Sequence, residues 1–542
     1  MNLRTLAPTA DAVRRYTEAG YWQDDGIGDI LERQAARRPD REALVDARRR
    51  LTYAQYAAAA RRLASHWRAL GLTRDDVIAI QLPNWNEYAI AVAAAALLGI
   101  PFCHFHSDFR RKEVEFILRF SGATLLVMPS SFRGFDHQAM LRELRPALPG
   151  LRHLEVVGDG VAADAFDLRA FLDADDAAGG DLPPRPHGND VLRLLFTSGT
   201  TGDPKAVVHT HNTSLCSCRF HVRDYGITQD SAFLLFLPVG LNWGFGTTIQ
   251  TLIAGCKLVY LDVFRPEIAL RLISQERITH VATAPAGLVA LLAAPTFAHY
   301  DLSSLRVVIT GGASCPIELI REWRSKAPGH LLELYGMAEC GGQACTKLTE
   351  DPEQVCGTVG RPTREMGMRL VDGDGADVTT GEIGEILSTG PSVMLGYYNN
   401  PDANARSFTD GGWFRTGDLG TLDAAGYLRI AGRKKEMIIR GGANIYPREI
   451  EEVLHKHPAV QDAAVIGLPH DRLGEQACAC IVLRPGMATN AAEIVDFLRG
   501  SIATYKLPEQ VRFIAELPRT PTGKVQRGPL RELVEDEAWT SA

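Results

Sequence analysis

Short apolar runs alternate with amphipathic segments between residues 41 and 370. Runs of this length, bounded by turn residues, are typical of strands buried on both faces, and the segments between them are typical of helices. The alternation predicts an α/β fold with largely parallel strands, whose functional loops follow the carboxyl ends of those strands. The predicted strands lie in VIAIQL (77–82), TLLVM (124–128), KLVYL (257–261), HVATA (280–284) and LRVVITGG (305–312).

The pattern changes twice toward the C-terminus. From Gly381 the chain is rich in glycine and aromatic residues and carries short strand-like runs, which suits a small β-rich unit. Near Lys434 it changes again, to an amphipathic helix followed by two strands and a second helix, which suits a separate α/β unit. One side of the first of these helices carries Ile450, Val453 and Leu454.

These changes divide the chain into two expected domains. The larger spans residues 1–434 and consists of α/β subdomains with a β-rich subdomain at about 355–432, and the smaller α/β domain spans 435–542. About 110 residues is an ordinary size for a domain. The stretch 158–190, rich in Ala, Asp and Gly, is expected to be a surface excursion or flexible loop.

Length and charge narrow the class of protein. The chain has 542 residues, a length greater than one hydrophobic core usually supports, so two or more domains are expected. Its apolar content of 46% is ample to fill their cores. Its 58 Lys and Arg are outnumbered by 65 Asp and Glu, and the net charge of −7 argues against nucleic acid or an anionic membrane as partner. The longest apolar stretch, 88–102, is too short to span a bilayer, and no signal peptide follows Met1. We therefore expect a cytoplasmic protein without stable membrane insertion.

The ten cysteines and the paired histidines do not predict a metal centre. Two C-x-C pairs, at 216–218 and 478–480, lack a partner at zinc spacing, which favours buried free thiols. Two histidine pairs alternate in strand-like contexts, so each pair should share one face: His104 with His106, and His209 with His211. No carboxylate or cysteine completes a site with them, and no transition metal is assigned.

The segment LLFTSGTTGDPKAVVHTHN (194–212) breaks an apolar run with a cluster of Thr, Ser, Gly and Asp. Gly199 and Gly202 allow successive N–H groups to converge, and converging donors together with Lys205 suit a polyphosphate. A hydrophilic hairpin turn is the alternative. A Walker A loop does not fit, because Lys205 follows a proline and precedes AVVH, which predicts a strand where that motif needs a helix.

Four further motifs follow this loop along the sequence. The five are TSGTTGDPK (197–205), GGA (311–313), YGMAE (335–339), TGD (416–418) with GRKKEMIIRGGANIYP (432–447), and PRTPTGKVQR (518–527). Together they resemble the adenylate-forming superfamily of acyl-CoA synthetases, aryl-acid ligases, peptide-synthetase adenylation domains and beetle luciferases, over essentially the whole chain. RRYTEAGYWQDDGIGDIL (14–31) and QLPNWNE (81–87) are similar to 2,3-dihydroxybenzoate-type ligases and to alicyclic and aryl acid CoA ligases.

The resemblance implies ATP-dependent activation of a small carboxylic acid. The acid would attack the α-phosphorus of ATP, release pyrophosphate and form an acyl-adenylate, from which a thiol would take the acyl group. CoA is the favoured acceptor, and a stand-alone ligase that loads the phosphopantetheine of a separate carrier protein is the alternative. A non-catalytic nucleotide-binding scaffold is the alternative from another class. The oligomeric state stays open, with a homodimer as one form.

The resemblance also assigns the nucleotide site. The β- and γ-phosphates would be held by Thr197, Ser198, Gly199, Thr200, Thr201, Gly202 and Lys205, and Mg²⁺ by Thr201 and Glu339. The rest of ATP would contact Gly311, Gly312, Ala313, Tyr335, Gly336, Met337, Asp418 and Arg433. Within this set Tyr335 would stack on adenine, and Asp418 would accept hydrogen bonds from the ribose. Lys524 would reach the reacting carboxylate and the α-phosphate, and Lys524, Glu339 and Lys205 form the implied catalytic set.

Each of these assignments has a plainer alternative. Glu339 could be a solvated acid in a turn, Tyr335 a core tyrosine, and Asp418 with Arg433 an ion pair at a domain boundary. The interpretation as a nucleotide site is preferred because one reaction makes sense of all of these residue types. In that reaction a carboxylate meets the phosphates of ATP, and positive charge has to neutralise these anions.

The acyl pocket is expected around Leu241, Asn242, Trp243, Gly246 and Gly311. The chain departs from the commonest family pattern at two positions: Ala338 replaces a threonine, and Leu241 replaces a histidine or aromatic gate. Asn242 stands where amino-acid-activating members usually place an aspartate, so the ammonium of an amino acid would lack its counter-ion. Aryl or cyclic acids are therefore expected to be preferred over palmitate and α-amino acids.

The family resemblance further implies that the C-terminal domain is mobile. It would present Lys524 for adenylation and then turn about a hinge at Lys435 to present its other face for thioester formation. Gly441 and Gly442 would then line the tunnel for the thiol. The alternative is that these two glycines only permit a tight turn with positive φ.

Overall fold

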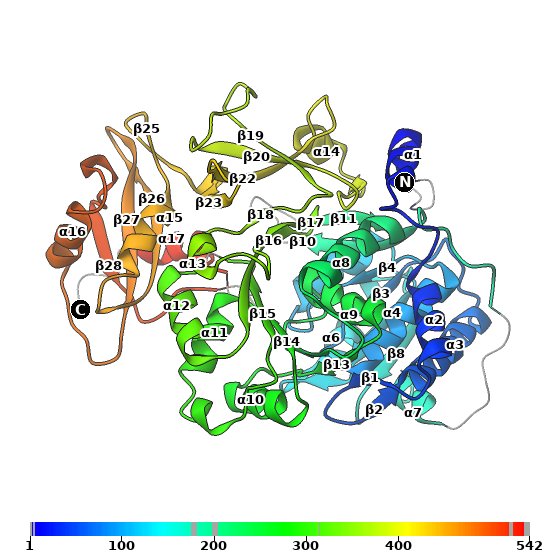
Figure 1. The fold of residues 1–542 in the computed structure, drawn as a ribbon. Coiled ribbons are helices and arrows are strands. Elements are labelled where there is room, and N and C mark those ends of the chain that lie inside the picture. Colours follow the sequence, from blue (N-terminus) through cyan, green and yellow to red (C-terminus); the bar gives the residue numbers. More distant parts are fainter. Residues whose placement is uncertain are drawn as a thin grey trace.

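The computed structural model describes residues 3, 6–174, 182–197, 204–313, 315–519 and 524–535 (Figure 1). Two large sheets form the main body. One has the order β18-β17-β16-β15-β14-β12-β13-β1-β2, and its pairs from β13 to β16 are parallel. Its strands are β1 (Glu42–Val45), β2 (Arg50–Thr52), β12 (Ala232–Leu235), β13 (Lys257–Tyr260), β14 (His280–Thr283), β15 (Val307–Gly311), β16 (His330–Met337), β17 (Gly341–Cys345) and β18 (Arg361–Pro362).

The second large sheet has the order β21-β11-β10-β4-β3-β5-β8-β9. Its strands are β3 (Ile78–Ile80), β4 (Phe102–His104), β5 (Leu125–Pro129), β8 (His153–Val157), β9 (Phe166–Asp167), β10 (Val191–Thr197), β11 (Lys205–Thr210) and β21 (Gly396–Tyr397). All five apolar runs named above lie in or around parallel strands of these two sheets, which confirms the predicted α/β class.

Helices fill the space between the two large sheets and cover their outer faces. One core joins apolar residues of both sheets with the inner helices α2 (Ile27–Arg37), α3 (Tyr53–Ala69), α4 (Asn86–Leu98), α8 (His211–Asp224) and α9 (Asn242–Ala254). α4 is buried along nearly its whole length, which explains its Ala-rich sequence without a polar face. The outer helices are α5 (Arg111–Ser121) and α6 (His137–Leu144) on one sheet, and α10 (Pro266–Gln275), α11 (Pro285–Leu292) and α12 (Ile317–Lys326) on the other.

Two smaller sheets follow in the C-terminal third. The four-stranded antiparallel sheet contains β19 (Gly367–Val371), β20 (Gly384–Thr389), β22 (Phe414–Leu422) and β23 (Leu428–Arg433). The five-stranded sheet contains β24 (Ile438–Arg440), β25 (Ala443–Ile445), β26 (Val460–His470), β27 (Gly474–Leu483) and β28 (Gln510–Phe513), and packs with α15 (Pro447–Leu454) and α16 (Ala491–Arg499). The remaining α-helices of the described residues are α1 (Ala10–Glu18), α7 (Leu168–Asp173), α13 (Pro352–Val355), α14 (Pro401–Ser407) and α17 (Arg527–Glu535).

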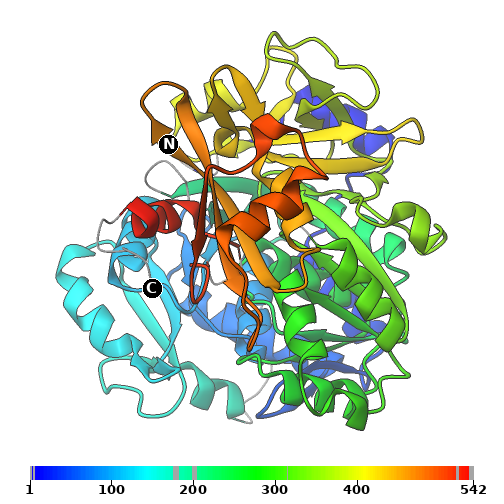
Figure 2. The same ribbon diagram turned by 90° about the vertical axis from the view of Figure 1, so that its left-hand side faces the viewer.

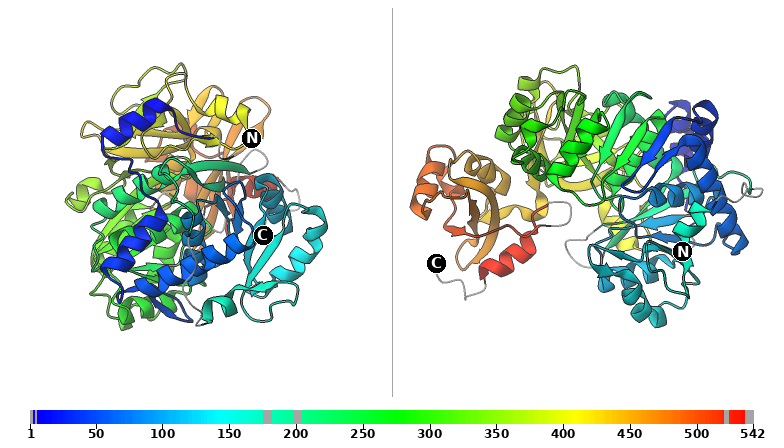
Figure 3. Two further views of the ribbon diagram at one scale, coloured as in Figure 1. Left: turned by 90° about the vertical axis from the view of Figure 1, so that its right-hand side faces the viewer. Right: turned by 90° about the horizontal axis from the view of Figure 1, so that it is seen from below.

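The five-stranded sheet and its helices form a separate lobe. A 3₁₀ turn, Lys434–Glu436, joins this lobe to the four-stranded sheet. Figure 2 views the molecule from the side of the lobe, drawn in orange and red, and the right-hand view of Figure 3 shows it set beside the main body. The lobe has its own hydrophobic core, which includes Ile438, Ile450, Val465 and Ile481.

The stretch 158–190, expected to be a surface excursion or flexible loop, is regular in part: it contains β9 and the short helix α7, in which Leu168 and Leu172 lie one helical turn apart and are both buried. Its residues 175–181 lie outside the described residues. One local expectation was wrong. His211 does not continue the strand of His209. It begins α8, where Thr210 caps the helix by accepting a hydrogen bond from the N–H of Thr213.

Candidate active site

Two antiparallel strands flank the predicted phosphate loop in the sequence. β10 ends at Thr197 and β11 begins at Lys205, and these two residues pair directly across the antiparallel ladder. The Thr197 hydroxyl donates to the carbonyl of Lys205 at 3.4 Å. Ser198, Gly199, Thr200, Thr201 and Gly202 lie outside the described residues. The strand after Lys205 confirms that the loop is not followed by a helix.

Lys205 and Glu339 are connected through a tyrosine that the sequence analysis did not select. The ammonium of Lys205 lies 4.9 Å from the centre of the Tyr397 ring, and the Tyr397 hydroxyl donates to Oε1 of Glu339 at 2.9 Å. Burial raises the pKa of Glu339, and the hydrogen bond from Tyr397 acts in the opposite direction. Strand β21 brings Tyr397 here by pairing with β11, where Tyr397 is opposite Val207.

Asp418 lies between Tyr335 and Arg433. The Tyr335 hydroxyl donates to Oδ2 of Asp418 at 2.8 Å, and Nε of Arg433 lies 3.2 Å from Oδ1. Asp418 and Arg433 are direct partners of the β22–β23 ladder, so the sheet register sets their contact. Burial raises the pKa of Asp418, whereas Arg433 and Tyr335 act to lower it. The structure thus brings three of the predicted nucleotide residues together.

Lys524 reaches the same place from the C-terminal lobe. Its ammonium is close enough to Arg433, Asp418, Glu339 and Glu436 to interact with them electrostatically. Desolvation and then the Arg433 charge lower the pKa of Lys524, while the three carboxylates act to raise it. All three residues of the predicted catalytic set therefore lie at or beside one cluster of charges.

The predicted glycines have close structural neighbours. A Cβ at Gly311 would lie 2.5 Å from the carbonyl oxygen of Leu334, and a Cβ at Gly336 would lie 2.6 Å from that of Gly341. Both positions therefore need glycine for strand packing, whatever else they contact. Gly312 has a left-handed φ of +74° and is exposed, as is Ala313 beside it.

The residues predicted for the acyl pocket cluster at the start of α9. Leu241 precedes the helix, and Leu241, Asn242, Trp243 and Gly246 are each only partly buried. A Cβ added at Gly246 or at Gly312 would make no clash, because its nearest side-chain atom would lie at an ordinary contact distance of 3.8 Å. At Gly312 that atom belongs to the Trp243 ring, so the acyl and nucleotide residues adjoin.

Asn242 has a partner that the sequence analysis also passed over. Its Oδ1 accepts a hydrogen bond of 2.7 Å from Nη2 of Arg193, and its Nδ2 lies 3.5 Å from the carbonyl oxygen of Met337. Arg193 belongs to β10 and directly precedes the segment 194–212.

Gly441 and Gly442 form the turn of the β24–β25 hairpin. Their φ values are +56° and +86°, and the flanking Arg440 and Ala443 pair across the ladder. Both glycines are exposed, and a Cβ at Gly442 would have no heavy atom within 4 Å. Lys435 lies in the 3₁₀ turn between the two smaller sheets, and desolvation followed by the Arg433 charge lowers its pKa.

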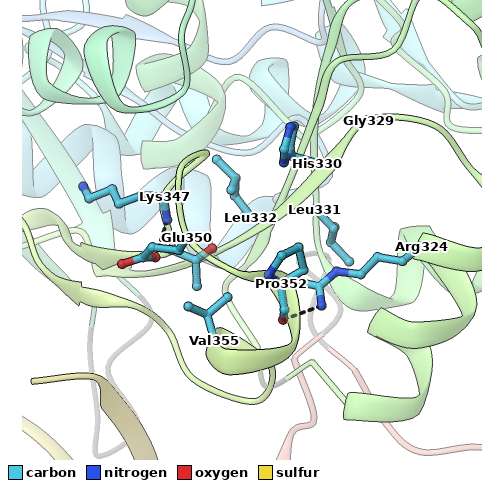
Figure 4. A pocket seen from close by; sticks show the side chains of 10 residues that line it. Arg324, Gly329, His330, Leu331, Leu332, Lys347, Glu350, Pro352 and Val355 are labelled. Carbon is cyan, nitrogen blue, oxygen red and sulfur yellow. Dashed lines mark hydrogen bonds between the residues drawn. The ribbon is translucent and has the colours of Figure 1, made fainter. Parts of the chain in front are cut away.

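Other features of the described residues do not add to this site. All ten cysteines are unpaired and buried, which confirms the prediction for the two C-x-C pairs. Within the described ranges, no three His, Cys, Asp or Glu side chains are grouped so that they could hold a metal, and no helix has the length and apolar character needed to cross a membrane. A cavity of about 190 Å³ lies at the start of β16, where Arg324 donates to the carbonyl of Pro352, and it contains none of the predicted site residues (Figure 4).

Comparison with protein families identifies the class. The model of the AMP-binding enzyme family matches residues 31–398, and that of the AMP-binding enzyme C-terminal domain matches residues 449–524. The chain therefore belongs to the AMP-binding enzyme family, and its resemblance to adenylate-forming enzymes is confirmed.

Individual relatives cover nearly the whole chain. It is 36% identical over 535 residues to the 2-hydroxy-7-methoxy-5-methyl-1-naphthoate–CoA ligase of Streptomyces carzinostaticus, covering 96% of this chain and 95% of that protein. It is 34% identical over 523 residues to the medium-chain fatty-acid–CoA ligase of Escherichia coli strain K12, covering 95% and 92%. The crystal structure of the anthranilate CoA ligase AuaEII in complex with anthranoyl-AMP has a TM-score of 0.88 at 28% identity, covering 95% of this chain and 98% of that one.

Proposed function

We propose that this protein is an acid–thiol ligase that activates an aryl or cyclic carboxylic acid with ATP and transfers it to CoA. The observation that carries the proposal is the electrostatic interaction of Lys524 with Asp418, Glu339 and Arg433. A lysine from a separate lobe has no structural need to approach two acids of the main body. It does have a chemical reason if a carboxylate and a phosphate meet there.

The first half-reaction follows from the charges. An oxygen of the substrate carboxylate forms a bond to the α-phosphorus of ATP, and the bond from that phosphorus to the bridging oxygen of pyrophosphate breaks. Negative charge accumulates on the phosphate oxygens, and fixed cations stabilise it best where water is excluded. Lys524 would neutralise the carboxylate and α-phosphate, and Lys205 the β- and γ-phosphates, while Asp418 would accept hydrogen bonds from the ribose.

The same residues suit a magnesium ion bound with the nucleotide. Glu339 offers a carboxylate beside Lys205, and one carboxylate plus phosphate oxygens is a common Mg²⁺ ligand set. When bound, the ion would supply further charge neutralisation. The hydrogen bond from Tyr397 orients the Glu339 carboxylate and opposes the rise of its pKa that burial causes.

The second half-reaction needs a different face of the C-terminal lobe. A thiol attacks the acyl carbonyl and AMP leaves, and we propose that residues 435–542 turn about Lys435 to admit the thiol past Gly441 and Gly442. In the arrangement described here the two glycines lie at an exposed hairpin tip and Lys524 lies at the site, which suits the adenylation step.

The acid and the acceptor are inferred from the pocket and from relatives. Asn242 offers hydrogen bonds but no negative charge to an ammonium, and two of the relatives are named for aromatic acids, a naphthoate and anthranilate. The third is named for medium-chain fatty acids, so chain length is a second variable to test. Loading of a carrier protein in place of CoA is the alternative for the acceptor.

Pyrophosphate release across a panel of acids tests the function. Hydroxybenzoates and cyclic acids should give higher kcat/KM than palmitate, octanoate or any α-amino acid, and CoA should exceed a holo-carrier protein as acceptor. If no acid stimulates exchange between ATP and pyrophosphate, the protein is a nucleotide-binding scaffold. A higher kcat/KM for a fatty acid or an amino acid would instead overturn only the choice of substrate.

A further inference from the structure

Arg193 is a buried cation surrounded by neutral groups. Only 3% of its surface is exposed, because it lies in β10, a strand with neighbours on both sides. Its Nε donates to the Ser214 hydroxyl at 3.1 Å, Nη1 lies 3.3 Å from Nε2 of His104, and Nη2 donates to Oδ1 of Asn242 at 2.7 Å. The Phe245 ring covers one face of the guanidinium, with 4.0 Å between its centre and the guanidinium carbon.

No carboxylate among the described residues is ion-paired with this guanidinium. Burial lowers the pKa of Arg193 to about 10, so the group is still charged at neutral pH. Burial and the Arg193 charge together lower the pKa of His104 and of His209 to about 3, so neither histidine adds charge. A buried cation that lacks an anion is costly, because no paired charge offsets its desolvation.

The hydrogen bonds also fix which atom of Asn242 can meet a substrate. Because Oδ1 accepts from Arg193, the amide must turn Nδ2, its donor, away from Arg193 and toward Met337. Trp243, the next residue along α9, contacts the position of a Cβ at Gly312 at 3.8 Å, so Asn242 lies in the segment that adjoins the predicted nucleotide residues. The guanidinium has five N–H groups, and its three described hydrogen-bond partners account for three of them. Asn242 thus offers a hydrogen-bond donor, and Arg193 a positive charge behind it, among the residues predicted for the acyl pocket.

We propose that Arg193 is a specificity-determining residue that, with Asn242, selects acids carrying a second oxygen acceptor near the reacting carboxylate, as an ortho hydroxyl or a second carboxylate. The inference rests on the proposed function. An acceptor oxygen satisfies the Asn242 donor and lies in the field of the Arg193 charge. A plain hydrocarbon acid leaves Nδ2, which has two N–H groups, with only the long 3.5 Å contact to the Met337 carbonyl, and an ammonium is repelled by the like charge. Arg193 acts through Asn242 and is therefore a positioning residue.

Three probe acids and four variants test this. Benzoate, 2-hydroxybenzoate and benzene-1,2-dicarboxylate are compared by kcat/KM in ATP–pyrophosphate exchange, and by the melting shift that each acid alone produces. For the wild type we expect 2-hydroxybenzoate or the dicarboxylate to exceed benzoate by about ten-fold, the range given by one satisfied hydrogen bond. The variants are Asn242→Asp, Arg193→Met, Arg193→Lys and, as control, Asn400→Asp.

Asn242→Asp is the decisive variant, because it places a carboxylate on Nη2 of Arg193. It should fold with a melting temperature at or above that of the wild type, and the preference for an oxygen-bearing acid should fall at least ten-fold, with the dicarboxylate affected most. Arg193→Met should lose the same preference, and Arg193→Lys should restore part of it. Asn400→Asp should keep the preference, because Asn400 caps α14 and either side chain can do so.

The outcomes separate this inference from the proposed function. Exchange with none of the acids would overturn the proposed function, and the melting shifts would still measure the preference. A wild type that prefers benzoate, or a preference that survives unchanged in folded Asn242→Asp and Arg193→Met, would overturn the role of Arg193. If Arg193→Met does not fold, Asn242→Asp alone decides, since it removes the free charge without removing the guanidinium.

Discussion

The hydroxyl of Tyr397 donates a hydrogen bond of 2.9 Å to Oε1 of Glu339, while the ring of the same tyrosine lies 4.9 Å from the ammonium of Lys205. One side chain therefore holds the proposed metal ligand and the proposed phosphate cation in fixed relation. Burial raises the pKa of Glu339, and Tyr397 is the first of the groups that oppose this rise.

Removing that hydroxyl should change the pH dependence of adenylation. In Tyr397→Phe the pKa of Glu339 should rise further, because the ionised carboxylate loses a donor while the desolvation remains. Activity needs the ionised form, so it is lost as pH falls through this pKa, and the acid limb of the profile should move to higher pH. A charged hydrogen bond is worth about 1.5 to 3 kcal/mol, or roughly ten- to hundred-fold in kcat/KM on that limb.

The pH profile of ATP–pyrophosphate exchange measures this. Tyr56→Phe is the matched control, because it loses a buried hydrogen bond to the carbonyl of Ala89 far from the site and should lower stability without moving the limb. An acid limb that stays in place in folded Tyr397→Phe would show that Glu339 does not control the rate.

Glu339→Gln keeps the shape of the side chain and removes its charge, while Lys205→Ala removes a phosphate cation. Each should lower the exchange rate by about 10² to 10³, the range for one lost charged contact in a transition state, and Glu339→Gln should cost more. The Glu339→Gln defect should also resist added Mg²⁺. Exposed Glu382→Gln and Lys326→Ala serve as surface controls. A near wild-type rate in Glu339→Gln would place the metal elsewhere.

The fold could be predicted where burial dominates. The runs at 77–82, 257–261 and 305–312 are apolar because β3, β13 and β15 have helices on both faces, and that environment leaves a direct trace in the sequence. Helix α7 left a weaker trace, because six residues with two buried leucines do not establish a helical period.

Only those residues of the candidate site that lie in the five sequence motifs could be predicted. Tyr397 and Arg193 were missed because their partners are 58 and 49 residues away, and only the tertiary fold brings each pair together. Arg193 is the sharper case. In a strand, alternate residues face opposite sides, and a single arginine in an apolar run does not reveal that its side faces a buried polar cluster.

The position of Lys524 leads to a test of the two half-reactions. Lys524→Ala should lower acyl-adenylate formation by at least 10², because the carboxylate and α-phosphate lose their shared cation. The same variant should convert a supplied acyl-adenylate and CoA to thioester at nearly the wild-type rate. Lys456→Ala, at another exposed lysine of the C-terminal lobe, should affect neither step. Equal loss of both steps in Lys524→Ala would contradict a mobile lobe.

The opposite pattern is expected at Gly442, with one refinement that the structure requires. Its φ of +86° strains any L side chain, so Gly442→Leu could fail through the hairpin alone. Gly442→Asn is the better variant, because asparagine tolerates positive φ and still adds a side chain. We expect Gly442→Asn to keep adenylation within about three-fold. It should lower thioester formation by about ten-fold or more, because its side chain narrows the tunnel; ten-fold in rate corresponds to about 1.4 kcal/mol.

Gly412→Asn is the matched control. Gly412 is exposed, has a φ of +75° and has no atom within 4 Å of its Cβ position, so this variant should leave both steps intact. If Gly442→Asn lowers both steps together while circular dichroism shows an intact fold, the glycine serves the hairpin turn and not the passage of the thiol.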